Sequence, residues 1–223
     1  MQNFSYAVDL VLCIDGTGSM SPVIKAVKSS ALAFYDDVMK VMGEKDKRID
    51  FLRVKVVLYR DFYADAEGVH QSAFFSLPDE TPAFASYVND IKADGGGDEP
   101  ESGLEALATA IKSDWTKEGS RQRHVIVFWT DASAHKLEDP RPKPANYPQE
   151  MPANFDEMTE LWETGQGAMG QTARRLIMFA PDAYPWSDIA SHWELTLHYA
   201  SKAGKGLEEV DYHSILDAIA NSI

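Results

Sequence analysis

Two strongly apolar runs in this 223-residue chain each lead into an aspartate. Residues 6–14 read YAVDLVLCI and are followed by Asp15, and residues 124–130 read HVIVFWT and are followed by Asp131. Runs that are apolar on both faces are typical of central strands in a parallel sheet. Because parallel strands end at one edge of the sheet, we expect the two carboxylates to meet there if the strands are neighbours.

The rest of the chain alternates apolar runs with helical patterns, which predicts an α/β, doubly wound (Rossmann-like) fold with helices on both faces. We expect a mostly parallel central sheet of about six strands. The link between residues 51–59 and 71–77 is too short for a crossover helix, so the strand over 71–77 should be an antiparallel edge strand. Residues 20–42 predict one long helix that Gly43 ends.

Residues 1–223 are expected to form one domain, because neither a repeat nor a long linker divides them. Five prolines between residues 136 and 153 predict an extended surface insertion without regular structure. The sequence shows no signal peptide and no membrane-spanning run, and it predicts a cytoplasmic protein. The net charge of −14 argues against nucleic acid or an anionic membrane as partner, although it also serves solubility.

The first aspartate opens a glycine-rich turn, DGTGSM, at residues 15–20. Asp15, Thr17 and Ser19 alternate along this turn, and a carboxylate with two hydroxyls suits Mg²⁺, Mn²⁺ or Ca²⁺. A turn between a strand and a helix can instead cradle a phosphate, or the same side chains can cap the turn and the next helix. This stretch alone leaves these alternatives open.

Two further stretches favour a metal. GGGDEPESG, residues 95–103, crowds acidic side chains around Pro100 where a helix is expected, and such a loop would repel phosphate. WTDASAH, residues 129–135, contributes Asp131. A helix start also favours acids without any metal. Neither a phosphate-loop lysine motif nor a nucleophile beside a base is found, so a phosphoryl-transfer enzyme or hydrolase is the weaker alternative and we expect no catalytic activity.

Together these stretches resemble the metal-ion-dependent adhesion site of the von Willebrand factor A domain family, whose motif is D-x-S-x-S, then a Thr or acidic residue, then a further Asp. DEPE at residues 98–101 and DASAH at residues 131–135 are most similar to the variety found in integrin β subunits. The resemblance covers essentially the whole chain. It implies a divalent cation, Mg²⁺ first, held by Asp15, Thr17, Ser19, Glu101 and Asp131. It also implies that Asp131 acts through water, and it allows the same for Asp15.

The chain departs from that pattern in several places. Thr17 replaces the usual serine, and Pro22 and Val23 stand where the integrin variety has aspartates for a flanking calcium ion, so that flanking site is not expected. The resemblance implies a possible second metal site formed by Asp61, Asp98, the Pro100 carbonyl and Glu101. Gly96 replaces the asparagine expected there, and Asp61 can alternatively cap a turn through Arg60 or a loop amide.

In this family an acidic residue of a partner completes the metal coordination. The resemblance therefore implies a cation-dependent protein-binding module, a monomer of bacterial origin. A scaffold whose metal only rigidifies the loops is the alternative. The residues expected to contact the partner are His135, Lys136, Arg141 and Lys143, with a structural histidine and a solvated loop as the plainer alternatives.

Overall fold

The computed structural model of the chain describes residues 5–96, 99–205, 207 and 211–223. In these segments the strands are β1 (Tyr6–Asp15), β2 (Phe51–Tyr59), β3 (Val69–Gln71), β4 (Phe75–Leu77), β5 (Arg121–Trp129), β6 (Arg174–Pro181) and β7 (Thr196–Ser201). The helices are α1 (Ser21–Ser30), α2 (Phe34–Glu44), α3 (Thr81–Asp90), α4 (Gly103–Ile111), α5 (Phe155–Thr164), α6 (Trp186–His192) and α7 (Tyr212–Ser222). Two short 3₁₀ turns span Gly18–Met20 and Gly165–Gly167.

The strands form one sheet in the order β3-β2-β1-β5-β6-β7, and β4 also pairs with β2. β1 lies near the centre, parallel to both β2 and β5. Its register pairs Ile14 with Trp129, so the two chain segments that follow leave the sheet at the same edge. The expectation that these two apolar strands are parallel neighbours is confirmed.

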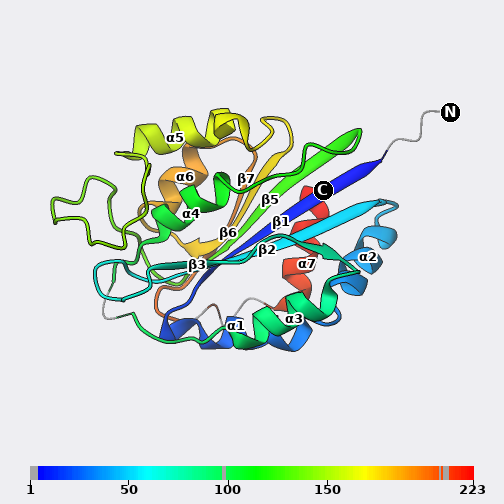
Figure 1. Cartoon of the computed structure of the whole chain (residues 1–223), viewed down its shortest axis with the longest axis horizontal. Coiled ribbons are helices and arrows are strands. Elements are labelled where there is room, and N and C mark those ends of the chain that lie inside the picture. Colours follow the sequence, from blue (N-terminus) through cyan, green and yellow to red (C-terminus); the bar gives the residue numbers. More distant parts are fainter. Residues whose placement is uncertain (1–4, 97–98, 206, 208–210) are drawn as a thin grey trace.

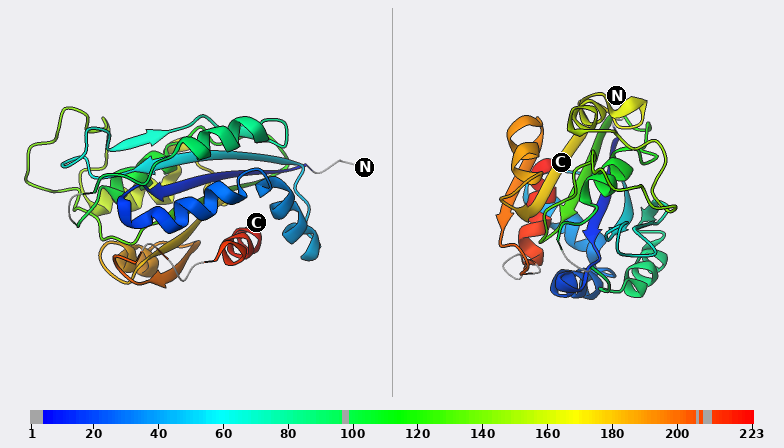
Figure 2. Two further views of the ribbon diagram at one scale, coloured as in Figure 1. Left: turned by 90° about the horizontal axis from the view of Figure 1, so that it is seen from below. Right: turned by 90° about the vertical axis from the view of Figure 1, so that its left-hand side faces the viewer.

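Helices cover both faces of the sheet, as expected for a doubly wound fold (Figures 1 and 2). Helices α1, α2, α3 and α7 pack on one face, and α4, α5 and α6 pack on the other. Alternate residues of β1 enter the two cores: Leu10 and Leu12 face the first group, and Val11 and Cys13 face the second. A strand with both faces buried needs this continuous apolar run, because successive side chains point to opposite faces.

One edge of the sheet differs from the single antiparallel strand expected over residues 71–77. The two short strands β3 and β4 pair with β2 instead, and both are antiparallel to it. Between them, Ser72 Oγ accepts a hydrogen bond from Val56 N (3.0 Å) and donates one to Ala73 O (2.6 Å). A side chain that takes the place of a backbone partner interrupts the ladder, so the sheet has seven strands rather than about six.

The prediction of a single helix over residues 20–42 is wrong, because α1 and α2 occupy this segment with a bend between them. Ala31 and Ala33 donate their N–H groups to carbonyls three residues earlier, which tightens the chain into turns there. Gly43 does not end the helix either. It lies inside α2, which continues to Glu44.

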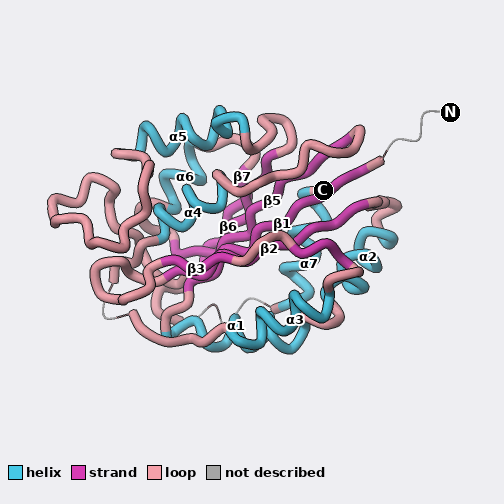
Figure 3. The backbone as a smooth tube through the Cα atoms, viewed as in Figure 1, coloured by secondary structure: helices cyan, strands magenta, loops and turns pink. Residues whose placement is uncertain are grey.

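The loops that follow the parallel strands gather at one end of the molecule, on the left in Figure 3. Residues 136–153 contain no helix or strand and project at this end, as the prolines predict. No helix in the described segments is both long and apolar enough to cross a bilayer. The candidate functional residues lie among these loops.

Candidate metal site

The loop after β1 is held in shape by the buried carboxylate of Asp15. Asp15 Oδ1 accepts hydrogen bonds from Thr17 N (2.9 Å) and Thr17 Oγ1 (2.7 Å). Asp15 Oδ2 accepts one from Thr130 Oγ1, directly after β5 (2.8 Å). Gly16 N donates to Tyr59 O, the last residue of β2 (2.7 Å). The ends of three adjacent strands therefore fix this loop.

Ser19 joins the loop to the second strand-end carboxylate. Its Oγ donates to Asp131 Oδ1 (2.9 Å) and lies 3.3 Å from Thr17 Oγ1. A hydroxyl has a single proton to donate. When Thr17 donates to Asp15 and Ser19 donates to Asp131, no proton remains between the two hydroxyl oxygens. Their lone pairs are then left for another electrophile, and hard oxygens of this kind are ligands for divalent cations.

Glu101 reaches the same loop from the segment before α4. It is 4% exposed, and its Oε2 has no hydrogen-bond partner among the described residues. Its backbone is fixed on the loop that follows β5, because Glu101 N donates to Ser133 O (3.0 Å) and His135 N donates to Glu101 O (2.9 Å). A Cβ on Gly96 would lie 2.8 Å from Thr17 Cβ and 3.1 Å from Glu101 Oε1, so both side chains lie against this glycine. A buried carboxylate oxygen without a donor is costly unless a cation or a proton meets it.

Burial and mutual repulsion disfavour the charged forms of these acids. Burial raises the pKa of Asp15 to about 6 against the opposing effect of its hydrogen bonds, and the charge of Asp131 adds to the rise. Burial also raises the pKa of Glu101 to about 8. The carboxylates whose charges raise that pKa further are Asp15, Asp61, Asp65 and Asp131. A divalent cation in this region would relieve the repulsion.

The donor set consists of hard oxygens, which fit Mg²⁺, Mn²⁺ or Ca²⁺ better than zinc. Within the described ranges, no three His, Cys, Asp or Glu side chains come together to hold a metal ion by themselves. Asp15 and Asp131 instead accept the protons of the two hydroxyls. The hydroxyl oxygens of Thr17 and Ser19 and Oε2 of Glu101 therefore keep lone pairs for a cation, and cation binding by the aspartates themselves stays a prediction.

The loop at residues 94–96 accommodates the methyl group that distinguishes Thr17 from serine. Asp94 N donates to Gly16 O (3.0 Å), which holds the two loops together. Gly96 has a φ of +75°, and a Cβ there would come within 2.8 Å of Thr17 Cγ2. The lack of a side chain at position 96 therefore makes room for the threonine.

Two residues of this region were not expected from the sequence. Thr130 is buried and orients the carboxylate at the end of β1. Asp65 lies in the loop between β2 and β3, where its Oδ2 accepts from Asp61 N (3.3 Å) and Gly96 N (3.4 Å). Thr130 carries a usable signal, a hydroxyl at the end of a buried strand, whereas Asp65 has no comparable local pattern.

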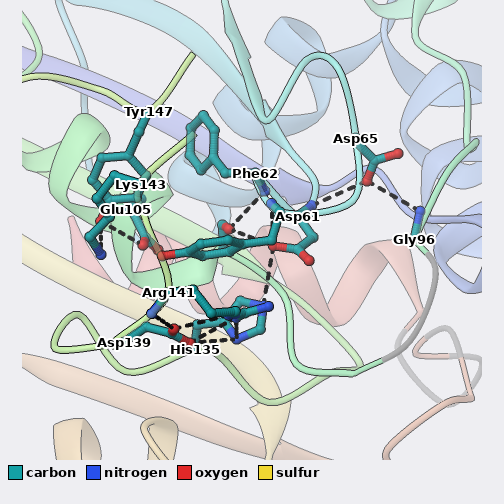
Figure 4. A network of polar contacts seen from close by, with 12 residues as sticks. Asp61, Phe62, Asp65, Gly96, Glu105, His135, Asp139, Arg141, Lys143 and Tyr147 are labelled. Atoms are coloured by element: carbon teal, nitrogen blue, oxygen red, sulfur yellow. Dashed lines mark hydrogen bonds and ion pairs between the residues drawn. The ribbon is translucent and has the colours of Figure 1, made fainter. Parts of the chain in front are cut away.

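Asp61 is bound by protein donors (Figure 4). Its Oδ1 accepts from Tyr63 N (3.0 Å) and from Ser102 Oγ (3.1 Å), and it lies 3.2 Å from His135 Nε2. Tyr63 N is a loop amide, so the geometry matches the turn-capping alternative.

The other members of the expected second metal site add little. Asp98 lies outside the described residues, and Pro100 is partly buried immediately before Glu101. Arg60 is not the partner of Asp61, because its guanidinium donates to the carbonyl oxygens of Asp94 (2.6 Å) and Lys92 (3.0 Å). The second site stays a prediction.

The structure matches the structural alternative given for His135, and its contact with a partner stays a prediction. The residue is 7% exposed and lies between Asp61 and Arg141 (Figure 4). Arg141 Nη2 lies 2.9 Å from His135 Nδ1, so the tautomer with its proton on Nε2 satisfies both neighbours. Arg141 also binds Asp139 through two of its nitrogens (2.9 and 2.8 Å) and covers the Tyr63 ring at 3.8 Å.

The basic residues expected to attract a partner lie on the insertion at residues 136–153. Lys136, Arg141 and Lys143 are exposed. Lys143 Nζ donates to a backbone carbonyl (3.0 Å) and to Tyr147 OH (3.2 Å), so it also shapes the insertion. Tyr147 OH donates in turn to Glu105 Oε1 on α4 (2.8 Å), which anchors the insertion beside the site.

The family model described as the von Willebrand factor A domain matches residues 9–140. The alpha-protein kinase vwkA of Dictyostelium discoideum is 28% identical over 136 residues, which cover 60% of this chain and 20% of the relative. A putative ariadne-like RING finger protein, R811, of Acanthamoeba polyphaga mimivirus is 25% identical over 134 residues, which cover 60% of this chain and 12% of the relative. The chain thus spans a fifth or less of the length of these curated relatives.

Solved structures share the fold at low sequence identity. The pilus adhesin SpaC from Lactobacillus rhamnosus GG has a TM-score of 0.58 at 10% identity, covering 99% of this chain and 31% of the adhesin. A von Willebrand factor type A protein from Catenulispora acidiphila has a TM-score of 0.51 at 12% identity. The similarity covers 97% of this chain and 41% of that protein. Because the family model matches more than half of its residues, this chain belongs to the von Willebrand factor A domain family.

Proposed function

We propose that this chain is a divalent-cation-dependent protein-binding module whose cation engages an acidic residue of a partner. Domains of this family commonly mediate protein–protein interaction or adhesion. One observation carries the proposal. Thr17 Oγ1 and Ser19 Oγ lie 3.3 Å apart with their protons directed to carboxylates, and Glu101, which lies against the same glycine as Thr17, has an unpartnered Oε2. Mg²⁺ is the preferred cation, with Mn²⁺ and Ca²⁺ as alternatives.

Thr17, Ser19 and Glu101 would hold the cation, and Asp15 and Asp131 would orient the two hydroxyls. The bound cation supplies an electrophilic position for a carboxylate of the partner. Two of the three holding groups are neutral, so the cation keeps much of its attraction for an acidic ligand. The adhesion-site motif of the integrin β variety, carried by DEPE and DASAH, is part of this proposal.

The insertion at residues 136–153 is proposed to set partner specificity, because it projects beside the site and carries exposed Lys136 and Arg141. These cations act within a Debye length of about 8–10 Å, where they offset the net charge of −14 that would repel an acidic partner. The curated relatives are much longer, and one is named a protein kinase. We propose that such a module directs a larger protein or assembly to its partner.

Replacing Ser19 by alanine tests the cation site. Ser19 is exposed, so S19A should fold normally yet bind Mg²⁺ at least about tenfold more weakly by isothermal titration calorimetry, because one holding oxygen is lost. S29A is the matched control, since Ser29 is an exposed serine of α1 that binds only the Ala26 carbonyl. Equal Mg²⁺ affinity in S19A and the wild-type chain would contradict the site.

Partner capture is tested with the same two variants. Pull-down with Mg²⁺ should recover a partner that is lost in EDTA and lost with S19A, but retained with S29A. Competition by an acidic peptide should reduce the recovery. Metal binding without any cation-dependent capture would favour the rigidifying scaffold and contradict the binding role.

A further inference from the structure

A separate cavity lies at the opposite end of the sheet from the candidate metal site, where β1, β5 and β6 begin. The starts of β1 and β5 lie towards the N label in Figure 1. Its volume is about 710 Å³, within the range of roughly 300–1,000 Å³ typical of small-molecule sites. The chain between α2 and β2, the start of β5 and the segment before β6 form its walls. Its described lining includes none of the candidate metal ligands.

Cationic side chains concentrate in this cavity, although the chain as a whole carries a net charge of −14. The cations that line it are Lys47, Arg48, Arg121 and Arg123. Asp46 also lines the cavity and offsets one of these charges. Arg48 lies 3.0 Å from Asp50, but its side chain is 85% exposed, and exposed pairs of this kind are weak and readily exchanged.

The protein satisfies these cations only in part. Lys47 Nζ donates to a carbonyl of α7 (2.8 Å), whereas Arg123 Nε is buried and has no hydrogen-bond partner in the described segments. Burial, together with the charges of Lys45 and Arg123, lowers the pKa of Lys47. Burial and the charge of Arg123 likewise lower the pKa of Arg175 nearby. Burial is the larger cause in both groups, and the neighbouring cations add to it. The acids near the cavity, Asp46 and Asp50, are fewer than its cations.

We propose that this cavity binds an oligophosphate anion, that is, a pyrophosphate or triphosphate group that is either free or part of a nucleotide. The planar fork of arginine matches phosphate oxygens, and hydrogen bonds between charged groups are about twice as strong as neutral ones. The cations come from two separate segments, residues 47–48 and 121–123. A chain of phosphates can contact both segments in a cavity of this size, whereas one orthophosphate would fill a small part of it.

Calorimetry in EDTA at low salt tests the proposal. EDTA removes divalent cations, so the anion cannot bind through a metal at the other end of the molecule. Tripolyphosphate and ATP should bind the wild-type chain, and adenosine should not. Equal affinity for tripolyphosphate and ATP assigns binding to the phosphates alone, and tighter ATP binding assigns the site to a nucleotide. Affinity should fall as NaCl is raised.

Arg48 and Arg121 are exposed, so the double variant R48Q/R121Q should fold and bind tripolyphosphate at least about tenfold more weakly. K25Q/K40Q is the matched control, because it removes the same charge from exposed lysines that do not line the cavity. S19A should bind tripolyphosphate like the wild type, which separates this site from the proposed metal site. Absence of binding at about 1 mM, equal weakening in both double variants, or equally tight binding of polyglutamate would overturn the proposal.

Discussion

At the scale of single residues, the candidate metal site concentrates negative charge that the chain alone does not neutralise. Glu101 is buried with one unpartnered oxygen, and burial, together with the charges of Asp15 and Asp131, raises its pKa. Gathering carboxylates in a buried region lowers the free energy of unfolding. A cation that binds the folded state raises the free energy of unfolding again, because a ligand stabilises the state to which it binds more tightly.

Replacing Glu101 by glutamine should therefore have opposite effects with and without metal. In EDTA at pH 7, E101Q should raise the free energy of unfolding by about 1 kcal/mol, because the buried Glu101 must either take up a proton or keep its charge beside the aspartates, and a neutral amide does neither. In Mg²⁺, the wild-type chain should gain stability and E101Q should gain much less. Thermal unfolding under both conditions measures the two differences. E99Q, an exposed glutamate two residues earlier, is the control, and an E101Q chain that is less stable in EDTA would contradict the repulsion.

At the scale of elements, the insertion at residues 136–153 is anchored on α4 by a hydrogen bond to a buried acid. Tyr147 OH donates to Oε1 of Glu105, which is completely buried, and the Tyr147 ring packs against Phe62 at 5.4 Å. Burial raises the pKa of Glu105, and the hydrogen bond from Tyr147 opposes this rise. The bond thus stabilises the charged carboxylate and ties the insertion to the domain.

Y147F should destabilise the chain by about 1–3 kcal/mol at neutral pH, because it leaves a buried carboxylate without its donor. The pKa of Glu105 in the folded state should rise further, so the folded variant binds protons that the unfolded chain releases. Stability of Y147F should therefore fall more steeply than that of the wild type as pH rises from about 4 to 8, and the two should converge in acid. Urea denaturation at several pH values across this range measures the free energy of unfolding of both chains. Y199F on β7 is the control, and a difference that does not change with pH would contradict the role of Glu105.

The pattern of apolar residues in the sequence was sufficient to predict the class of the fold. It predicted β1 and β5 in particular, because strands buried on both faces need unbroken apolar runs. It could not predict the break at Ser72, which depends on one side chain bonding to the backbone. Asp65 approaches the site through a loop, and nothing local marks it. His135 follows a metal-site motif, yet Arg141 folds back from six residues further on and covers it.

At the scale of the whole molecule, the two charged regions lie at opposite ends of the sheet. The acids follow the carboxyl ends of the strands, and the basic cavity lies where the strands begin. β1 has ten residues, so it separates the two regions by roughly 30 Å. This distance exceeds a Debye length of about 8–10 Å, and the regions share no lining residue among those described. They should therefore bind their ligands independently.

Independence predicts additive effects on thermal stability. The increase in Tm caused by Mg²⁺ should be the same in R48Q/R121Q as in the wild-type chain, and it should be smaller in S19A. Differential scanning calorimetry with and without Mg²⁺ checks both variants. A reduced metal effect in R48Q/R121Q would show that the two ends are coupled.

The fit of Thr17 against Gly96 has an evolutionary consequence. A Cβ at position 96 would lie 2.8 Å from both the Cβ and the methyl group of Thr17, and the positive φ there disfavours residues other than glycine. Serine at position 17 would keep the same Cβ, so glycine is required at position 96 with either residue as long as the two loops keep this separation. A homologue that carries a side chain at position 96 should therefore hold the loop at residues 94–96 further from the loop that follows β1.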